Sequence, residues 1–88
     1  MDYTPKIAKA ELKHGHYYKG RCRNAYVARW DANTQLFYYW REKFGERFIE
    51  EIHCPEDENR YDVFITEEDL TELHQTVIII PIPTEGNN

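Results

Sequence analysis

The sequence predicts a mainly β fold: a small, strongly bent antiparallel sheet or barrel of five or six short strands, with one short helix near residues 66–74. Segments rich in aromatic and β-branched residues alternate with clusters of turn formers, as in strands joined by hairpins. Only one segment, Thr-Glu-Glu-Asp, has the composition of a helix start. Because 88 residues suffice for one core, we expect a single domain over residues 1–83 and a flexible tail over residues 84–88.

The first two predicted strands lie within residues 16–30. His-Tyr-Tyr-Lys-Gly forms a short strand that closes at Gly20, and residues 22–30 form the second strand. Side chains alternate between the two faces of a strand, so one face of the second strand is predicted to be buried and the other to be basic at its ends. The predicted buried face comprises Cys22, Asn24, Tyr26, Ala28 and Trp30, and the other face comprises Arg23, Ala25, Val27 and Arg29.

The next two strands are predicted over residues 35–42 and 46–53. Asp-Ala-Asn-Thr before them is rich in turn formers, so it joins them to the preceding strand as a hairpin. Apolar residues recur at every fourth position from Leu36 to Ile52, a spacing that a helix also allows. Gly45 is unfavourable in a helix and favourable in a turn, and aromatic residues favour strands. We therefore prefer two strands joined around residues 43–45.

The last third of the chain is predicted to contain a strand, a helix and an edge strand. Residues 60–65 have the composition of a short strand. Thr66 is expected to be the N-cap of a helix that reaches His74, because the three acidic residues after it favour the positive end of a helix. The run Val-Ile-Ile-Ile-Pro-Ile-Pro at residues 77–83 is expected at a sheet edge or strand end, because its prolines cannot donate hydrogen bonds.

Composition indicates a cytoplasmic protein without membrane contact. No apolar run approaches the roughly 18 to 20 residues that span a bilayer. The N-terminal segment lacks the apolar block of a secretory signal. Two cysteines allow at most one disulfide, fewer than is typical of small secreted domains, so we expect reduced thiols. We expect no cofactor.

Charge is distributed unevenly along the chain, whose net charge is −5. Residues 1–30 carry seven Lys or Arg against two acidic residues, whereas residues 50–88 carry eleven acidic residues against one Arg. In one interpretation the two segments pair across neighbouring strands, with each pair contributing a few tenths of a kcal/mol to about 1 kcal/mol. In the other, they form separate faces, one of which attracts a charged partner.

Two charged surfaces are the candidate binding sites. The first, which we call the basic ledge, comprises Lys19, Arg21, Arg23 and Arg29 with Tyr18. The second, the acidic pole, comprises Glu56, Asp57, Glu58, Glu67, Glu68 and Asp69. Residues 17–30 are also a candidate single-stranded nucleic-acid surface, because cations neutralise phosphates while rings stack on bases. The negative net charge and the expected burial of Tyr26 and Trp30 count against nucleic acid.

Metal binding and catalysis have weaker support in the sequence. The possible zinc ligands are His14, His16, Cys22, His53 and Cys54, but they form neither a C-x-x-C nor an H-x-x-x-H pair. Adjacent residues such as His53 and Cys54 point to opposite faces of a strand. The acidic surroundings of Cys54 disfavour a reactive thiolate. The acidic run Pro-Glu-Asp-Glu-Asn-Arg-Tyr-Asp lacks the residue order of a calcium loop. We expect a protein that is not an enzyme, with ordinary histidines and buried thiols.

The meander of short strands with one helical turn resembles small barrels of the Src-homology-three type. Tyr17-Tyr18-Lys19-Gly20, with Phe44-Gly45 later in the chain, is also similar to small bacterial and phage domains of unknown function, over about the middle half of the chain. The resemblance implies a binding module and supplies no activity to transfer.

The function we expect from the sequence is a non-enzymatic interaction module that contacts a protein partner through its charged faces. Size and charge also suggest a phage or mobile-element accessory protein. The alternatives are a small barrel that binds single-stranded nucleic acid and a small metal-binding domain. An edge strand at residues 77–83 would also allow a homodimer, because it would present unpaired backbone groups to a second copy.

Overall fold

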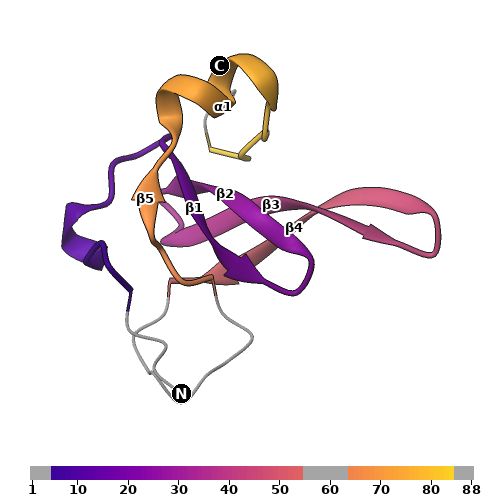
Figure 1. The fold of residues 1–88 in the computed structure, drawn as a ribbon, viewed down its shortest axis with the longest axis horizontal. Helices are drawn as coiled ribbons and strands as arrows, with labels where there is room; N and C mark the ends of the chain where they lie inside the picture. The colour runs from indigo at the N-terminus through magenta and orange to yellow at the C-terminus, as the bar shows by residue number, and fades with distance from the viewer. Residues whose placement is uncertain (1–4, 55–63, 85–88) are drawn as a thin grey trace.

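In a computed structural model, which describes residues 5–54 and 64–84, the chain forms a five-stranded antiparallel sheet with one short α-helix (Figure 1). The predicted mainly β class with a single short helix is confirmed. Across the sheet the strand order is β4-β3-β2-β1-β5, so the sheet is open and the barrel alternative is wrong. The elements are a 3₁₀ turn η1 (Lys9–Glu11), β1 (Tyr17–Cys22), β2 (Ala25–Asp31), β3 (Leu36–Lys43), β4 (Glu46–His53), β5 (Glu68–Asp69) and α1 (Thr71–Val77).

A tight turn at Arg23 and Asn24 joins β1 to β2. Arg23 has a φ of 54°, and Cys22 pairs with Ala25 across the hairpin. The predicted continuous strand over residues 22–30 is therefore wrong, because the chain reverses direction within it. The predicted buried face is correct for Cys22, Ala28 and Trp30 and wrong for Asn24, which is exposed, and for Tyr26, whose side chain is 72% exposed.

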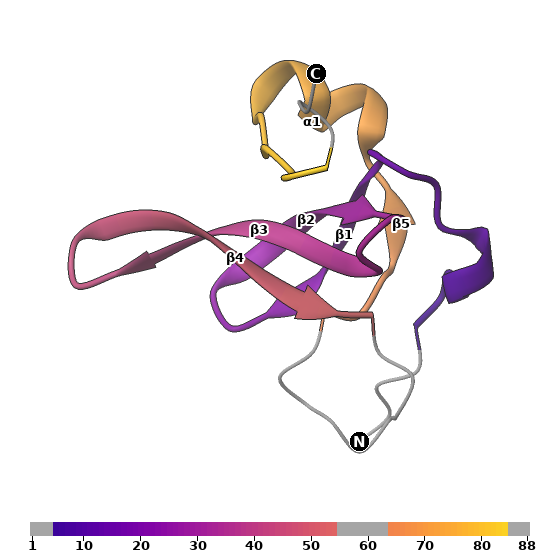
Figure 2. The ribbon, with the colours of Figure 1, turned by 180° about the vertical axis from the view of Figure 1, so that it is seen from behind.

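The hairpin of β3 and β4 confirms the two strands predicted there and excludes the helix. All eight residues of β3 pair with β4, from Leu36 opposite His53 to Lys43 opposite Glu46. Phe44 and Gly45 both have positive φ, 53° and 80°, as the favoured two-residue hairpin turn requires. The pairing of β3 with β2 covers only Leu36–Tyr38. The rest of the hairpin, residues 40–49, projects from the sheet, and we call it the arm (Figure 2).

Both faces of the sheet are buried. Tyr17 and Tyr18 are adjacent in β1 and therefore point to opposite faces, yet each is almost fully buried. One face packs Tyr18, Cys22, Ala25, Ala28, Trp30, Phe37, Tyr39, Cys54 and Phe64 beneath Ile7 and Leu12 of the N-terminal segment. The other face packs Tyr17 and Tyr38 against Ile78, Ile80 and Ile82 of the C-terminal segment.

The last third of the chain differs from the prediction. Glu68 and Asp69 form β5 beside β1 and do not belong to a helix, because the Leu70 N–H bonds to the Tyr17 carbonyl and the Glu67 N–H to the Lys19 carbonyl. Thr66 is buried and is not an N-cap. The helix begins at Thr71. Of the strand predicted over residues 60–65, residues 64–65 are not in a strand and residues 60–63 lie outside the described part.

The predicted edge strand at residues 77–83 is also wrong. Val77 ends α1, and residues 78–84 cross one face of the sheet without joining its ladder. Three side chains hold the backbone of this segment, and we call their three hydrogen bonds the clamp. The Ile80 N–H donates to the Tyr17 hydroxyl at 3.1 Å, an Arg29 N–H donates to the Ile80 carbonyl at 2.9 Å, and the Trp40 indole N–H donates to the Ile79 carbonyl at 3.0 Å.

The predicted tail begins with an ordered residue. Thr84 is partly buried, and its hydroxyl donates a hydrogen bond to the Asp31 carboxylate. Residues 85–88 lie outside the described part.

Tyr17→Phe is expected to destabilise the fold by about 1–3 kcal/mol, because it leaves the buried Ile80 N–H without an acceptor. Urea unfolding measures the loss, and amide exchange at Ile80 and Ile82 locates it. Tyr26→Phe, at an exposed ring, is the control and should change stability by less than about 0.5 kcal/mol. Equal losses in the two variants would contradict this role of Tyr17.

Gly20→Ala is expected to destabilise the fold by about 3 kcal/mol. A Cβ at Gly20 would lie 2.1 Å from the Ile65 carbonyl oxygen and 2.7 Å from the Phe64 ring, so the backbone would have to move. A Cβ at Gly45 would have no atom within 4 Å, so Gly45→Ala is expected to lower stability only because alanine disfavours the positive φ, by about 1 kcal/mol. Urea unfolding of both variants separates the two effects, and a Gly20→Ala loss no larger than that of Gly45→Ala would refute the close packing.

Candidate functional site

An apolar groove of about 400 Å³ lies between α1 and the sheet. This volume is within the range of roughly 300 to 1,000 Å³ that is typical of ligand pockets. Its aliphatic lining comes from both sides: Ala25 and Val27 of β2, and Leu70, Ile78 and Ile80 from the ends of α1 and the segment after it. Trp40 and Tyr26 add two aromatic rings. Apolar walls from two parts of the chain with a few polar groups between them are typical of ligand sites.

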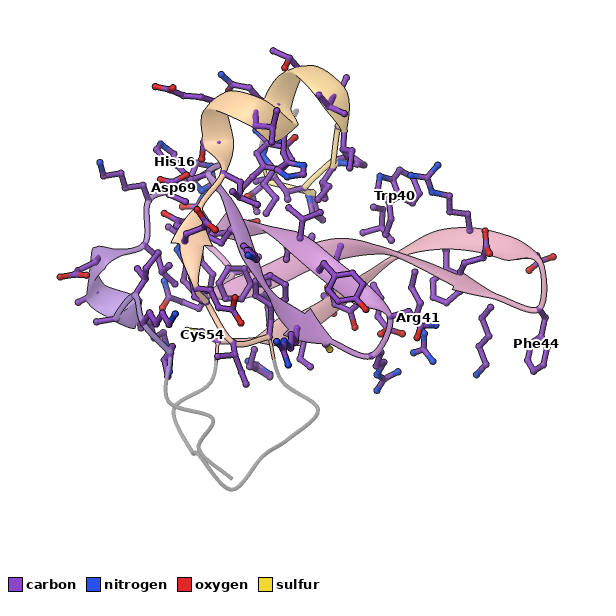
Figure 3. The ribbon with its side chains drawn as sticks, in the orientation of Figure 1. His16, Trp40, Arg41, Phe44, Cys54 and Asp69 are labelled. Atoms are coloured by element: carbon purple, nitrogen blue, oxygen red, sulfur yellow. The ribbon has the colours of Figure 1, made fainter. Side chains whose placement is uncertain are left out.

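The clamp positions the walls of this groove. Trp40 lies on the side of the arm that faces α1, whereas Phe44 lies at the far tip of the arm (Figure 3). The Trp40 indole lines the groove and donates a hydrogen bond to the Ile79 carbonyl. It thereby joins the sheet side of the groove to the segment that follows α1. The guanidinium of Arg47 stacks on the Trp40 ring, with its central carbon 4.5 Å from the ring centroid.

The polar lining of the groove is cationic or neutral. Lys19, Arg47, His74 and Asn24 contribute polar groups, and no Asp or Glu within residues 5–54 and 64–84 lines the groove. The Nδ1 atom of His74 is inaccessible to water and has no hydrogen-bond partner among the described residues. Buried polar atoms nearly always have partners, and this nitrogen is an exception within the described part of the chain.

The structure does not place the basic ledge on one free surface. Tyr18 is buried, and its hydroxyl accepts the Lys13 N–H at 2.9 Å. Burial raises the pKa of the Tyr18 phenol, although the Lys13 hydrogen bond acts in the opposite direction. Arg29 donates to the Gly15 and Ile80 carbonyls and stabilises the fold. Lys19 and Arg21 lie on β1 and Arg23 lies in the turn after it.

The described part of the acidic pole lies beside these cations. Nζ of Lys19 is 3.5 Å from Glu68, Nε of Arg21 is 3.7 Å from Glu67, and Nδ1 of His16 is 2.7 Å from Asp69. Arg23 lies 3.3 Å from Glu50 of β4. Basic and acidic segments therefore pair across neighbouring strands here. Glu56, Asp57 and Glu58 lie outside the described residues.

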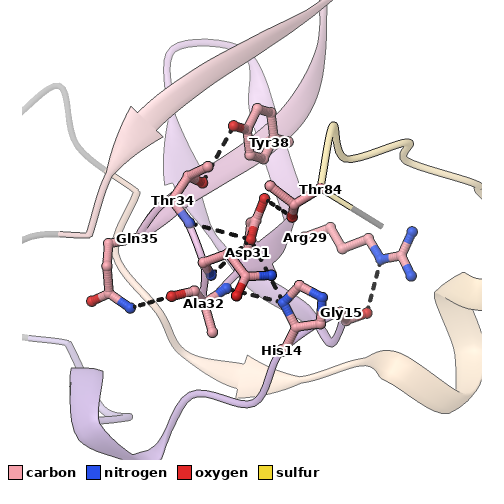
Figure 4. Close-up of polar contacts among 10 residues, drawn as sticks. His14, Gly15, Arg29, Asp31, Ala32, Thr34, Gln35, Tyr38 and Thr84 are labelled. Carbon is pink, nitrogen blue, oxygen red and sulfur yellow. Dashed lines mark hydrogen bonds and ion pairs between the residues drawn. The ribbon is translucent and has the colours of Figure 1, made fainter. Parts of the chain in front are cut away.

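Asp31 organises the turn beside Arg29 and His14 (Figure 4). Its buried carboxylate accepts the Asn33 and Thr34 N–H groups at 2.8 and 3.3 Å and the Thr84 hydroxyl. Burial by itself raises the pKa of Asp31, but these hydrogen bonds outweigh it and hold the pKa below its usual value. His14 accepts the Ala32 N–H at 3.1 Å, which gives it a structural role.

The five candidate metal ligands do not converge. Within residues 5–54 and 64–84, no three His, Cys, Asp or Glu side chains are grouped as a metal site requires. His14 and His16 bond to different partners, and His53 is exposed at the end of β4. Cys22 and Cys54 lie in the same buried cluster and are not joined to each other as a disulfide.

Cys22 ends a buried polar chain. Its thiol donates to the Tyr39 hydroxyl at 3.5 Å, and that hydroxyl donates to Glu50, which also holds Arg41 at 2.7 Å. Burial, with the hydrogen bonds to Cys22 and Glu50, raises the pKa of Tyr39 far above its ordinary value. Tyr39 therefore remains protonated and links β3 to β4.

Of the residues that line the groove, the sequence singled out Lys19, in the basic ledge, but not Trp40, Arg47 or His74. Trp40 and Arg47 were assigned only to strands, and His74 only to a helix end. The sequence does contain a signal for one contact. In the hairpin of the arm, Trp40 and Arg47 are diagonal cross-strand neighbours and share a face, so their side chains are expected to meet. Their approach to α1 depends on the C-terminal segment, which local patterns do not place.

Asp31→Asn is expected to lower stability at pH 7 by about 1–2 kcal/mol, because it weakens hydrogen bonds to a buried charge. The lowered pKa means that the stability contributed by ionised Asp31 is complete above about 3.8 and is lost as the pH falls through the folded-state value. The difference between wild type and variant should therefore shrink at pH 2. Urea unfolding at both pH values measures it, with Glu46→Gln on the exposed arm as control; a difference that persists at pH 2 would contradict this account.

In the part of the chain that the structure describes, no helix is long and apolar enough to cross a membrane. No protein-family model matches the chain, and no curated protein or solved structure matches it either. The functional interpretation therefore rests on the groove and the residues around it.

Proposed function

We propose that the protein is a non-enzymatic interaction module that holds an apolar side chain of a partner protein in the groove between α1 and the sheet. The observation that carries the proposal is the groove itself, whose two apolar walls are fixed by the clamp while Trp40 and Tyr26 remain accessible between them. Aromatic side chains of this kind are enriched at protein interfaces, where a few buried anchors supply most of the binding energy.

The chemistry of the lining supports binding over catalysis. Among the described residues that line the groove there is no carboxylate, thiol or aliphatic hydroxyl, the groups that most often act as nucleophile or general base beside a histidine. Apolar side chains make up most of this lining, as in a site that binds a side chain.

The nucleic-acid alternative has less support. A single-stranded binder needs exposed rings beside free cations. Of the residues assigned to that role, Tyr18 is buried and Arg29 is occupied by two backbone carbonyls. Arg23 lies beside Glu50, which also binds Arg41. Tyr26, however, is exposed, so the expectation that its burial counts against nucleic acid is wrong.

Selection of peptides tests the proposal without assuming their charge. A displayed library of random 12-residue peptides is selected against the wild-type protein, and the affinity of recovered peptides is measured by fluorescence anisotropy. Val27→Trp should weaken their binding at least tenfold, because the larger side chain occupies the groove from the sheet side.

Ile79→Trp is the matched control, because it introduces the same side chain at an exposed position that does not line the groove. It should leave binding unchanged, and circular dichroism verifies that both variants are folded. Peptides that bind equally well to Val27→Trp, or a selection that yields no binder, would overturn the proposed function.

A further inference from the structure

The charge of the groove is opposite to that of the protein as a whole. The net charge is −5, yet the Lys, Arg, Asp and Glu residues in the described lining of the groove are Lys19 and Arg47 alone. A cleft lined by one sign of charge concentrates ligands of the opposite sign, and its low-dielectric walls strengthen this effect. The groove therefore favours an anionic group next to its apolar floor.

Arg47 is oriented by Trp40. Its guanidinium lies over the indole ring at 4.5 Å from the centroid and forms no ion pair with a carboxylate of the described residues. A guanidinium stacked in this way keeps the N–H groups at its edge available. Its planar fork of donors matches a carboxylate, which it can bind through two parallel hydrogen bonds.

Lys19 supplies a second cation, from β1. Its ammonium lies 3.5 Å from Glu68, but the two side chains are 49% and 57% exposed. A pair this exposed is weak, so the ammonium can exchange Glu68 for a carboxylate on a ligand. Lys19 and Arg47 come from β1 and the arm, on either side of β2, which contributes Val27 to the floor.

His74 lines the groove on the helix side, but its Nδ1 atom is excluded from water and is not open to a ligand. The cationic donors of the lining are therefore Lys19, from β1, and Arg47, from the arm, with apolar surface between them.

We propose that the groove is specific for an acidic segment of the partner protein, in which one aromatic or large aliphatic residue is flanked by Asp or Glu. This inference rests on the proposed function and names the partner's chemistry. The apolar side chain packs on Val27, Trp40 and Ile78. The flanking carboxylates bind Arg47, which stacks on Trp40, and Lys19, whose exposed pairing with Glu68 they replace.

Three fluorescein-labelled peptides test the specificity: Asp-Glu-Phe-Glu-Asp, Ser-Ser-Phe-Ser-Ser and Lys-Arg-Phe-Arg-Lys, each capped at both ends. Fluorescence anisotropy gives their affinities at 20 and 300 mM NaCl. We expect the acidic peptide to bind at least tenfold more tightly than the neutral one at low salt, with a smaller ratio at high salt, because salt screens charges at a partly open site.

Charge reversal identifies the cations responsible. The double variant Lys19→Glu, Arg47→Glu should lose the preference for the acidic peptide and bind the basic one more tightly. The matched control is Arg21→Glu, Lys43→Glu, which makes the same change in net charge on β1 and the arm outside the groove lining. It should keep the preference for the acidic peptide, and circular dichroism confirms that both variants are folded.

The outcomes separate this inference from the proposed function. If library-selected peptides require the open groove but are neutral or basic, or if the two double variants behave alike, the acidic specificity is wrong and the interaction module stands. If no peptide binds the groove, both fail. If an oligo(dT) ten-mer displaces the acidic peptide and binds more tightly than it does, the groove recognises nucleic acid and the inference is overturned.

Discussion

The clamp between the C-terminal segment and the sheet is the interaction on which the groove depends. Residues 79 and 80 have no strand partner, and the Ile80 N–H, the Ile80 carbonyl and the Ile79 carbonyl bond instead to the Tyr17 hydroxyl, the Arg29 guanidinium and the Trp40 indole. These side chains come from three different strands. Because α1 precedes this segment directly, fixing the segment against the sheet also fixes the helix. None of the α1 residues is buried, so packing of the helix alone would not hold it there.

Burial on both faces explains how so short a chain supports an open sheet. A two-stranded or one-sided sheet of this size would bury little apolar area, and large rings offset that limit because each can bury roughly 150 to 250 Å². Tyr17 and Tyr18 illustrate the solution: consecutive rings of β1 belong to different clusters. The N-terminal segment covers one cluster and the C-terminal segment covers the other. Both irregular segments are thus part of the core.

Local sequence patterns predicted what local interactions determine. The β3 and β4 hairpin followed from its aromatic strands and from Gly45, whose positive φ closes the turn. The prediction was wrong where contacts with a strand or segment distant in the sequence determine the local conformation. Glu68 and Asp69 have helix-start composition, yet their position beside β1 gives them backbone partners and places Glu68 next to Lys19. Tyr26 was assigned to the core because the turn at Arg23, a residue without strong turn propensity, gave no signal. The groove combines two such nonlocal placements, so no single segment indicated it.

The pairing of charges across strands also determines which cations are available to a ligand. Most basic residues of the first thirty lie beside carboxylates or backbone carbonyls, which limits the use of the sheet as a general anion-binding surface. Arg47 differs because its partner is an aromatic ring, and a ring leaves its charge uncompensated. At physiological ionic strength charges are screened over about 8 Å. A long polyanion would meet the acidic surface as well as the groove, whereas a short acidic segment anchored by one apolar side chain would interact mainly with Arg47 and Lys19. Discrimination between these anions would then follow from the contrast between a locally cationic groove and a net acidic protein.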